Sequence, residues 1–334
     1  MNTALEIKTQ PAKPKSTRLI TLFSNGTIIS VLIFALVFVI YAGAGNNVLT
    51  AFSLNNLLNN TVALAIAATG LTLIILIGKF DMSVGGMVIL SNVIVSSDLG
   101  DGIGGVLLRL IMVILAGAIL GAINGFFVAY GGVQAIAITL ATMIMCQGVA
   151  LVLRPAPGGI VPMEISYGLT KLIGGVIPVA AIVILLFAAA WMFFRKTPFG
   201  VYIYGIGADE RASVQAGIDV KKYTFLTFVL AGVIYGLAGF MLSAQTASGD
   251  ASGGTLFLML VFAAVAIGGT TFGGGKGSVI GSIVGAGILT VLQKMLFVLG
   301  VSTFYTNIYQ GLILIAAVLI GGLSVKLSKR GETL

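Results

Sequence analysis

The sequence predicts an all-α polytopic membrane protein with about ten transmembrane helices, and its composition supports this fold class in three ways. Of 334 residues, 58% are hydrophobic and only 8% are charged, whereas soluble domains carry about 25% charged residues. The 46 glycines lie largely inside apolar runs, where membrane helices tolerate them. The single cysteine, Cys146, excludes an intramolecular disulfide, and the lack of histidine excludes catalytic triads and histidine-containing metal sites.

The predicted spans are apolar runs close to the ~17–25 residues that cross a bilayer. In chain order they are residues 27–44, 61–78, 82–97, 105–130, 133–153, 176–194, 223–245, 255–272, 277–299 and 303–323. A break near residues 79–81 is required, because one helix through the second and third runs would be about 57 Å long, nearly twice the hydrocarbon thickness. We expect one transmembrane domain over residues 27–323, a disordered cytosolic N-terminus (1–26) and a cytosolic tail (324–334).

The basic residues predict the orientation of these spans. Placing the N-terminus in the cytosol puts 14 of the 18 basic residues into inside segments and leaves four, Arg109, Arg154, Lys171 and Lys294, for the outer half. This asymmetry is typical of the positive-inside rule, so both termini and residues 195–222 are expected in the cytosol. The net charge of +8 is then a property of loops and does not indicate nucleic-acid binding. Residues 42–44 (Ala-Gly-Ala) also fit a signal-peptide cleavage site, but a retained span is favoured.

Small residues recur at four-residue spacing in several spans, which predicts close helix–helix packing. The glycines concerned are Gly117, Gly121 and Gly125, Gly232 and Gly236, and Gly277, Gly281 and Gly285. Packing within one bundle is the favoured interpretation. A dimer contact and a lining of the transport path remain open.

Few polar residues lie inside the spans, and these are candidates for a translocation path. Asp81 is the main one, since a carboxylate at membrane depth is a functional hypothesis by default, although an N-cap for a helix starting at Met82 is favoured. Asn92, Asn124 and Gln147 are further candidates. For Asn124 and Gln147, interhelical hydrogen bonding is the favoured role.

Charge is concentrated in residues 195–222, where a short helix is expected at "DERASVQAG". Asp209 can cap its N-terminus, Glu210 lies in its first turn, and Gly217 can end it in the left-handed conformation. A helix of about seven residues is not stable alone in water. It must therefore dock, either on the chain's own surface or in a groove of a partner, with Ala212 and Ala216 forming a small smooth face.

Three stretches carry a resemblance to a known family. "TPFGVYIYGIGADERASVQAGIDVKKY" (197–223) resembles T-x-x-G-x-x-x-x-A-x-G-x-N-x-x-A-A-x-x-x-G-I, and "GLTLIILIGKFDMSVGGMVIL" (70–90) resembles G-M-T-L-V-I-I-T-G-G-I-D-L-S-V-G. "AAVAIGGTTFGGGKGSVIGSIVGAGIL" (263–289) resembles A-A-V-V-L-G-G-T-S-L-x-G-G-x-G. In their order along the chain (70–90, 197–223, 263–289) these stretches are similar to bacterial ABC-importer permeases of the ribose/xylose/arabinose/galactoside class, across about residues 55–318.

The resemblance implies a type II ABC-importer-like bundle and several partners. These are a second permease subunit (identical or different), a periplasmic solute-binding protein and a cytosolic ATPase with two fused nucleotide-binding halves, which holds ATP and Mg²⁺. No cofactor or metal is expected on this chain. Residues implied to couple to the ATPase are Gly200, Gly207, Asp209, Glu210, Arg211, Ala212 and Gly217. Ser83 joins Asp81 as a path candidate because both match the second motif.

Departures from the family pattern matter for mechanism. Arg211 replaces the usual first alanine of the short helix, and Lys79 puts a cation beside Asp81, which predicts an interaction between them. Residues 253–269 lack the acidic residue that is usual in the family, so the resemblance does not carry over the family's usual sugar specificity. The glycine-rich "GGTTFGGGKGS" (268–278) is not a phosphate-binding loop, because Gly277 follows Lys276 where Ser or Thr is required.

The favoured function is therefore the membrane subunit of an ATP-driven importer for a monosaccharide or sugar-like solute in the bacterial inner membrane, not an enzyme. Two alternatives remain open. One is an ion-gradient-driven secondary transporter that uses Asp81, and the other is an ABC permease for a furanose-like signalling molecule or a nucleoside.

Overall fold

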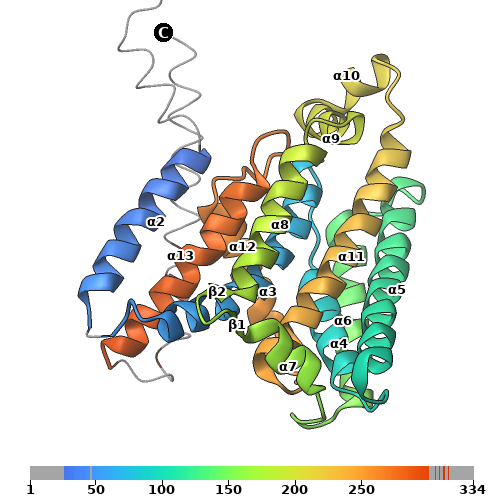
Figure 1. Cartoon of the computed structure of the whole chain (residues 1–334). Helices are drawn as coiled ribbons and strands as arrows, with labels where there is room; N and C mark the ends of the chain where they lie inside the picture. Colours follow the sequence, from blue (N-terminus) through green and yellow to red (C-terminus); the bar gives the residue numbers. More distant parts are fainter. Residues whose placement is uncertain are drawn as a thin grey trace, which may run out of the picture.

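The computed structural model describes residues 26–45 and 47–300, together with residues 305, 308, 311, 312 and 315. In this part of the chain, long helices run side by side and one small hairpin lies at an end of the bundle (Figure 1). The elements are α2 (Gly26–Gly43), α3 (Ala51–Leu76), α4 (Val84–Val95), α5 (Gly102–Ala129), α6 (Ala135–Leu153), α7 (Met163–Thr170), β1 (Leu172–Ile173), β2 (Ile177–Pro178), α8 (Val179–Phe194), α9 (Pro198–Ala208), α10 (Glu210–Gln215), α11 (Val220–Thr246), α12 (Gly254–Ile267) and α13 (Val279–Val298). The expected termini (1–25 and 324–334) and nearly all of the tenth span (303–323) lie outside the described residues.

The bundle has two distinct ends. Helices α9 and α10 lie at one end, and α7 and the β1–β2 hairpin lie at the other (Figure 1). The loop of residues 268–278 belongs to the α10 end, because the Gly275 amide donates to the Leu76 carbonyl at the end of α3 (3.0 Å). Lys79, Arg195 and Lys276 therefore share the α10 end, whereas Arg154 and Lys171 flank α7. This is the grouping of basic residues that the sequence predicted.

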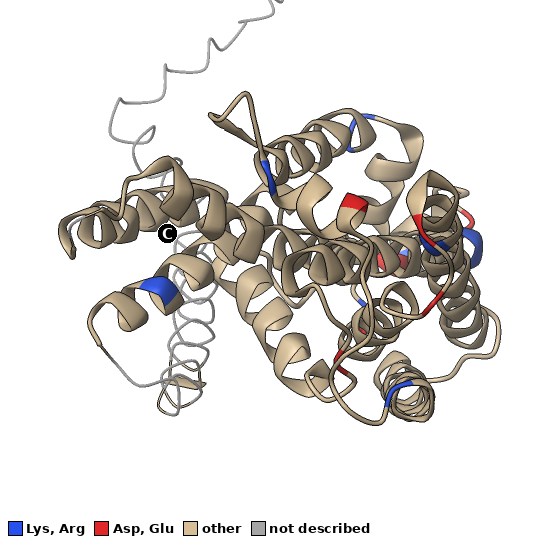
Figure 2. Ribbon diagram, turned by 60° about the horizontal axis from the view of Figure 1, so that its bottom comes forward, with Lys and Arg blue, Asp and Glu red and all other residues tan. Residues whose placement is uncertain are grey.

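The interior is formed by α3, α4 and α11, and the outer helices turn apolar side chains outward. In an apolar stretch of 18 residues, 83% of the α3 residues are buried, compared with 22% of the α5 residues. On α5 the exposed residues Leu107, Ile111 and Leu115 follow one another at helical spacing. Charged residues are sparse across the ribbon (Figure 2). An apolar outer surface on apolar helices is typical of a bundle surrounded by lipid.

The number of spans that the described residues support is smaller than predicted. Every predicted run up to residue 299 coincides with a helix, but only six helices in the described part are long and apolar enough to cross a membrane, or seven if α8 and α9 form one span bent by 79°. Helices α4 and α12 have 12 and 14 residues. At about 1.5 Å per residue, α4 extends only about 18 Å, which is half a bilayer.

Helix α3 begins ten residues before the predicted start at residue 61. Hydropathy did not predict this part of the helix, because its first turns are polar rather than apolar. Thr50 caps the helix by accepting from the Ser53 amide (3.2 Å). The amides of Asn55 and Asn59 then donate to the Thr170 carbonyl at the end of α7, at 2.8 and 3.0 Å. Hydrogen bonds to α7 therefore satisfy the polar side chains in a part of α3 that hydropathy alone does not assign to a span.

Three elements were not predicted: α7, the β1–β2 hairpin and α9. Helix α9 had a readable signal, since Pro198 occupies its first turn and Thr197 accepts from the Gly200 amide (3.3 Å). Proline at the first helical position after a threonine cap is a recognised start signal. Residues 195–222 thus hold two helices rather than one.

Candidate functional site

The short helix α10 has the boundaries and caps that the sequence indicated. Asp209 Oδ1 accepts from the Ala212 amide (3.0 Å) at its start. At its end, Gly217 has φ +78°, and the amides of Gly217 and Ile218 donate to the carbonyls of Val214 and Ser213, both at 3.0 Å. This pair of bonds is a Schellman motif. Both ends of a six-residue helix are therefore fixed.

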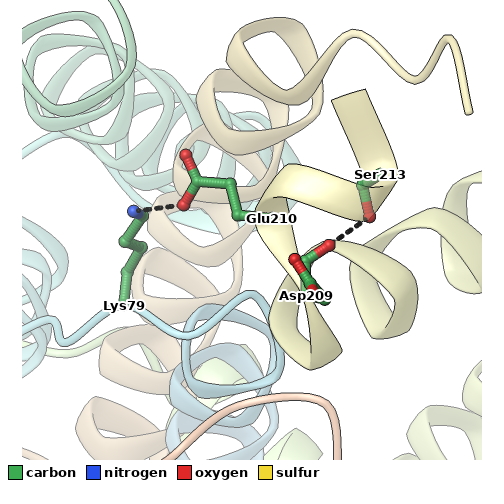
Figure 3. Close-up of polar contacts among 4 residues, drawn as sticks. All are labelled: Lys79, Asp209, Glu210 and Ser213. Carbon is green, nitrogen blue, oxygen red and sulfur yellow. Dashed lines mark hydrogen bonds and ion pairs between the residues drawn. The ribbon is translucent and has the colours of Figure 1, made fainter. Parts of the chain in front are cut away.

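Helix α10 lies on the surface and presents almost all of its side chains outward. Only Ser213 is buried, and its hydroxyl donates to the Asp209 carbonyl (2.9 Å; Figure 3). Val214 is 59% exposed, and Ala212 and Ala216 are exposed as well. Recesses of about 520 and 400 Å³ lie on its two sides, the first lined by Glu210, Arg211, Val214 and Gln215 and the second by Tyr202, 216–219, Lys222 and Tyr223.

Glu210 forms an ion pair with Lys79, not with a residue of its own segment. Lys79 Nζ lies 3.2 Å from Glu210 Oε2 (Figure 3). The predicted interaction between Lys79 and Asp81 is wrong, because Lys79 follows the end of α3 and its side chain reaches outward to α10. The pair joins positions 131 residues apart.

Glycines let three backbone segments meet beneath α10. A Cβ at Gly207, near the end of α9, would overlap the Leu76 carbonyl and the Gly275 amide, and one at Gly274 would lie 2.8 Å from the Gly78 Cα. At the start of α9, a Cβ at Gly200 would overlap the backbone of Phe194 and Arg195. Gly200 and Gly207 therefore shape this end of the bundle, as expected from their positions in the motif.

A hydrogen bond beside these glycines ties α9 to the 268–278 loop. The Tyr204 hydroxyl donates to the Gly277 carbonyl (2.6 Å). Burial raises the pKa of the Tyr204 phenol, and the nearby charge of Arg195 lowers it in part.

Asp81 and Ser83 lie in a buried polar cluster at the break between α3 and α4. The Asp81 carboxylate, 1% exposed, accepts hydrogen bonds from both the Ser83 amide and the Ser83 hydroxyl. Helix α4 starts at Val84 with Ser83 at the N-cap position. The predicted N-cap role of Asp81 is therefore wrong by two residues, and Asp81 instead bonds the turn that precedes the helix.

Asn124 joins this cluster to two further helices. Its amide donates to the Ser83 hydroxyl (3.1 Å), and its carbonyl accepts from the Thr142 hydroxyl of α6 (2.6 Å). The Thr139 hydroxyl, also on α6, accepts from the Met82 amide (3.0 Å). Sequence reasoning missed both threonines, because a threonine in an apolar helix commonly bonds its own backbone and gives no signal of a tertiary role.

One buried polar atom near this cluster has no partner. The Tyr235 hydroxyl of α11 is fully buried and lies beside the Asp81 carboxylate, but the two atoms do not meet hydrogen-bond geometry, and no other described residue bonds the hydroxyl. Its ring packs against α3 at Gly70, where a Cβ would lie 2.7 Å from the ring. Only glycine admits the tyrosine at this depth.

Of the remaining path candidates, Asn92 lies apart from Asp81, toward the α7 end, whereas Gln147 lies beside Gly254 and Gly85, at the first turn of α4. The Asn92 amide donates to the Ser243 hydroxyl (2.9 Å) and the Ser248 carbonyl (3.0 Å), and its carbonyl accepts from the Asp250 amide (2.9 Å). Gln147 is half-buried and contacts Thr255 at 3.4 Å. These residues make interhelical contacts, and the structure does not gather all five candidates into one site.

The glycines predicted to pack helices do so within this chain. Gly117 and Gly232 meet each other across α5 and α11, and Gly121 and Gly236 face the backbone of Phe228 and Val113 in the same contact. Gly125 meets Phe225 on α11. On α13, Gly281 meets Gly268 and Gly285 meets Ala264, whereas Gly277 precedes the helix with φ +148°. The favoured interpretation, packing inside one bundle, agrees with these contacts.

Together, the fold and the site define a multi-pass helical membrane protein with a polar break in its core and a capped, exposed helix at one end. Residues 53–318 match the family described as the permease component of the branched-chain amino acid transport system. The chain belongs to this permease family. It is a transport subunit and not an enzyme, as the motifs predicted.

Curated relatives align along most of both chains. The ribose import permease protein of Haemophilus influenzae is 35% identical over 277 residues, covering 80% of this chain and 85% of its own. The ribose import permease protein of Bacillus subtilis is 34% identical, with 79% and 83% covered. The D-allose transport system permease protein of Escherichia coli is 32% identical, with 75% and 78% covered. No solved structure matches the chain.

Proposed function

We propose that this chain is the membrane subunit of an ATP-driven importer for a monosaccharide or a sugar-like solute in the bacterial inner membrane. Relatives named for ribose and D-allose support a sugar rather than the branched-chain amino acid of the family description. In this proposal both termini are cytosolic and about ten segments cross the membrane, with α4 and α12 as short segments inside a type II importer-like bundle.

The observation that carries the coupling part of the proposal is the exposure of α10. A helix this short does not persist in water without support, yet α10 is capped at both ends and turns five of its six residues outward. The proposed occupant of its surface is a separate ATPase with two fused nucleotide-binding halves, which holds ATP and Mg²⁺. Arg211 and Val214, beside the larger recess, are the proposed contacts.

Two further partners belong to the proposal. A solute-binding protein docks at the α7 end and delivers the solute, and a second permease subunit completes the path between the two chains. The outward apolar faces of α5 and α6 are available both to lipid and to that subunit. Asp81, Ser83, Asn92, Asn124 and Gln147 remain the proposed polar lining or support of the path.

The energy source and the solute are tested by uptake into cells that express the chain with its neighbouring transport genes. Labelled D-ribose, D-allose and L-leucine are compared, with ATP depleted in one arm and the ion gradients collapsed by ionophores in another. We expect uptake of a sugar that requires ATP and survives the ionophores. Uptake that is lost with the ion gradient, and also lost in Asp81→Asn, would establish the secondary transporter instead.

The coupling role of α10 is tested at Gly217. Gly217→Arg places a bulky side chain where φ is +78°, so it strains the Schellman turn, whereas Gly217→Asn keeps a residue that tolerates this conformation. We expect Gly217→Arg and Glu210→Ala to insert normally. Gly217→Arg should lose co-purification of the ATPase, Glu210→Ala should lose transport-stimulated ATP hydrolysis, and Gly217→Asn should retain both. Normal assembly and uptake in both disruptive variants would reject the proposal.

A further inference from the structure

Six consecutive residues between α3 and α4, residues 78–83, contact six other parts of the bundle. Gly78 lies against Gly207 of α9 and Gly274. Lys79 pairs with Glu210 of α10, and Phe80 stacks on Phe262 of α12 (6.5 Å between ring centroids) and on Phe272 (5.9 Å). We call residues 78–83 the α3–α4 connection.

The second half of the α3–α4 connection runs into the buried polar cluster. Asp81 bonds Ser83 within the connection, the Met82 amide bonds Thr139 of α6, and Ser83 bonds Asn124 of α5. Lys79 is thus two residues from Asp81, whose carboxylate lies in the core, while the Lys79 side chain contacts the surface helix α10. No other ion pair occurs among the described residues.

Both partners of the Lys79–Glu210 pair project from fixed backbone. Helix α3 ends in a Schellman motif, with the Lys79 amide donating to the Ile74 carbonyl (3.1 Å), the Gly78 amide to the Ile75 carbonyl (2.9 Å), and Gly78 at φ +75°. Glu210 is the first residue of α10, directly after its cap. A displacement of α10 can therefore act on the end of α3 directly through these two side chains, in addition to the backbone contact that α9 makes there at Gly207.

The pair is also breakable, since the side chains of Lys79 and Glu210 are 29% and 54% exposed. Exposed ion pairs contribute little to stability and are screened by salt, so this pair does not hold the bundle together. Variants at Lys79 or Glu210 should therefore change the link between α10 and the α3–α4 connection without unfolding the bundle.

We propose that Lys79 is a positioning residue for energy coupling: its ion pair with Glu210 makes the α3–α4 connection, and with it the Asp81–Ser83–Asn124 cluster, follow the movement of α10. The inference rests on the proposed function, because it assumes that a partner moves α10. It departs from the family pattern, in which a glycine stands at this position. Glu210 then acts inside the chain, and Arg211 and Val214 are left for the ATPase.

The first test needs no partner and uses the full chain in lipid nanodiscs. Amide exchange in residues 211–218 is measured for the wild type, Lys79→Gln, Glu210→Gln and the double variant. We expect each single change to speed exchange by about two- to fivefold, as the loss of an exposed pair predicts, and the double variant to be no faster than either. Additive effects, or none, would overturn the proposal. Lys221→Gln, which removes an exposed lysine at the start of α11, is the matched control and should match the wild type.

The second test measures ATP hydrolysed per D-ribose imported in proteoliposomes with the ATPase and the binding protein. Lys79→Gln should raise this ratio, Lys79→Arg should restore it toward the wild type, and Lys79→Glu with Glu210→Lys should recover more coupling than either reversal alone. An unchanged ratio in Lys79→Gln, or no recovery in the double reversal, contradicts the positioning role. If the wild type imports neither D-ribose nor another sugar with ATP, the proposed function fails, whereas the exchange measurement still decides whether the pair holds α10.

Discussion

Asp81 and Lys79 are two residues apart, yet the fold gives them opposite surroundings. The Asp81 carboxylate is turned into the core, where it accepts two hydrogen bonds from Ser83. Lys79 is turned out to Glu210 on α10. The positive φ of Gly78 ends α3 and redirects the chain into the α3–α4 connection, which holds both residues. Burial of a carboxylate is tolerated only where donors meet it, and here the following turn supplies them.

The cap of α10 provides a test at the same scale. Asp209→Ala removes the acceptor for the Ala212 amide, and loss of such a cap costs about 1 kcal/mol. We expect faster amide exchange in residues 211–215 and weaker association with the ATPase. Asp209→Ser keeps a hydroxyl that can cap, so it should stay close to the wild type. Equal exchange in the alanine and serine variants would show that the cap does not support the helix.

Between elements, the contact of α5 with α11 depends on backbones that approach closely. Gly117 and Gly232 leave no room for a Cβ on either helix. Since lipid and the bundle interior are similarly apolar, such close packing has to replace the hydrophobic drive that holds soluble helices together. Small-xxx-small spacing predicted the close approach, and the structure supplied the partner helix.

Two glycines of α5 allow this contact to be tested with a matched control. Gly117→Ala adds a methyl group that meets the Gly232 carbonyl, whereas Gly104→Ala adds one with nothing within 4 Å. Overpacking typically destabilises by about 1–3 kcal/mol, so Gly117→Ala should lower the midpoint of thermal unfolding in nanodiscs. Gly104→Ala should leave it unchanged or raise it, because alanine favours helix over glycine. The same midpoint in both variants would argue against tight packing at Gly117.

In the whole molecule, basic residues divide between the two ends of the bundle, and this division carries the predicted orientation. The α10 end holds Lys79, Arg195, Lys196 and Lys276, and the α7 end holds Arg154 and Lys171. A single chain with both ends polar and its sides apolar is what a bilayer requires. The sign of the asymmetry predicts that the α10 end faces the cytosol.

Cysteine labelling in intact cells tests this orientation. The native Cys146 is buried, so an impermeant maleimide should report only on introduced thiols. We expect Lys171→Cys to react from outside, and Lys196→Cys, which is also exposed, to react only after the cells are permeabilised. The reverse pattern would invert the topology and remove α10 from the reach of a cytosolic ATPase.

The sequence by itself determined the features that depend on composition and on neighbouring residues. These are the membrane environment, the positions of most spans, the caps of α10 at Asp209 and Gly217, and the family motifs. Only the tertiary structure decided which distant residues meet: Lys79 with Glu210, Asn124 with Ser83 and Thr142, and Gly117 with Gly232. It also decided that α3 begins in an asparagine-rich stretch, whose amides find their partner on α7. A cap or a span follows from local geometry and hydropathy, whereas such pairs depend on how helices pack, and many packings are compatible with one pattern of apolar residues.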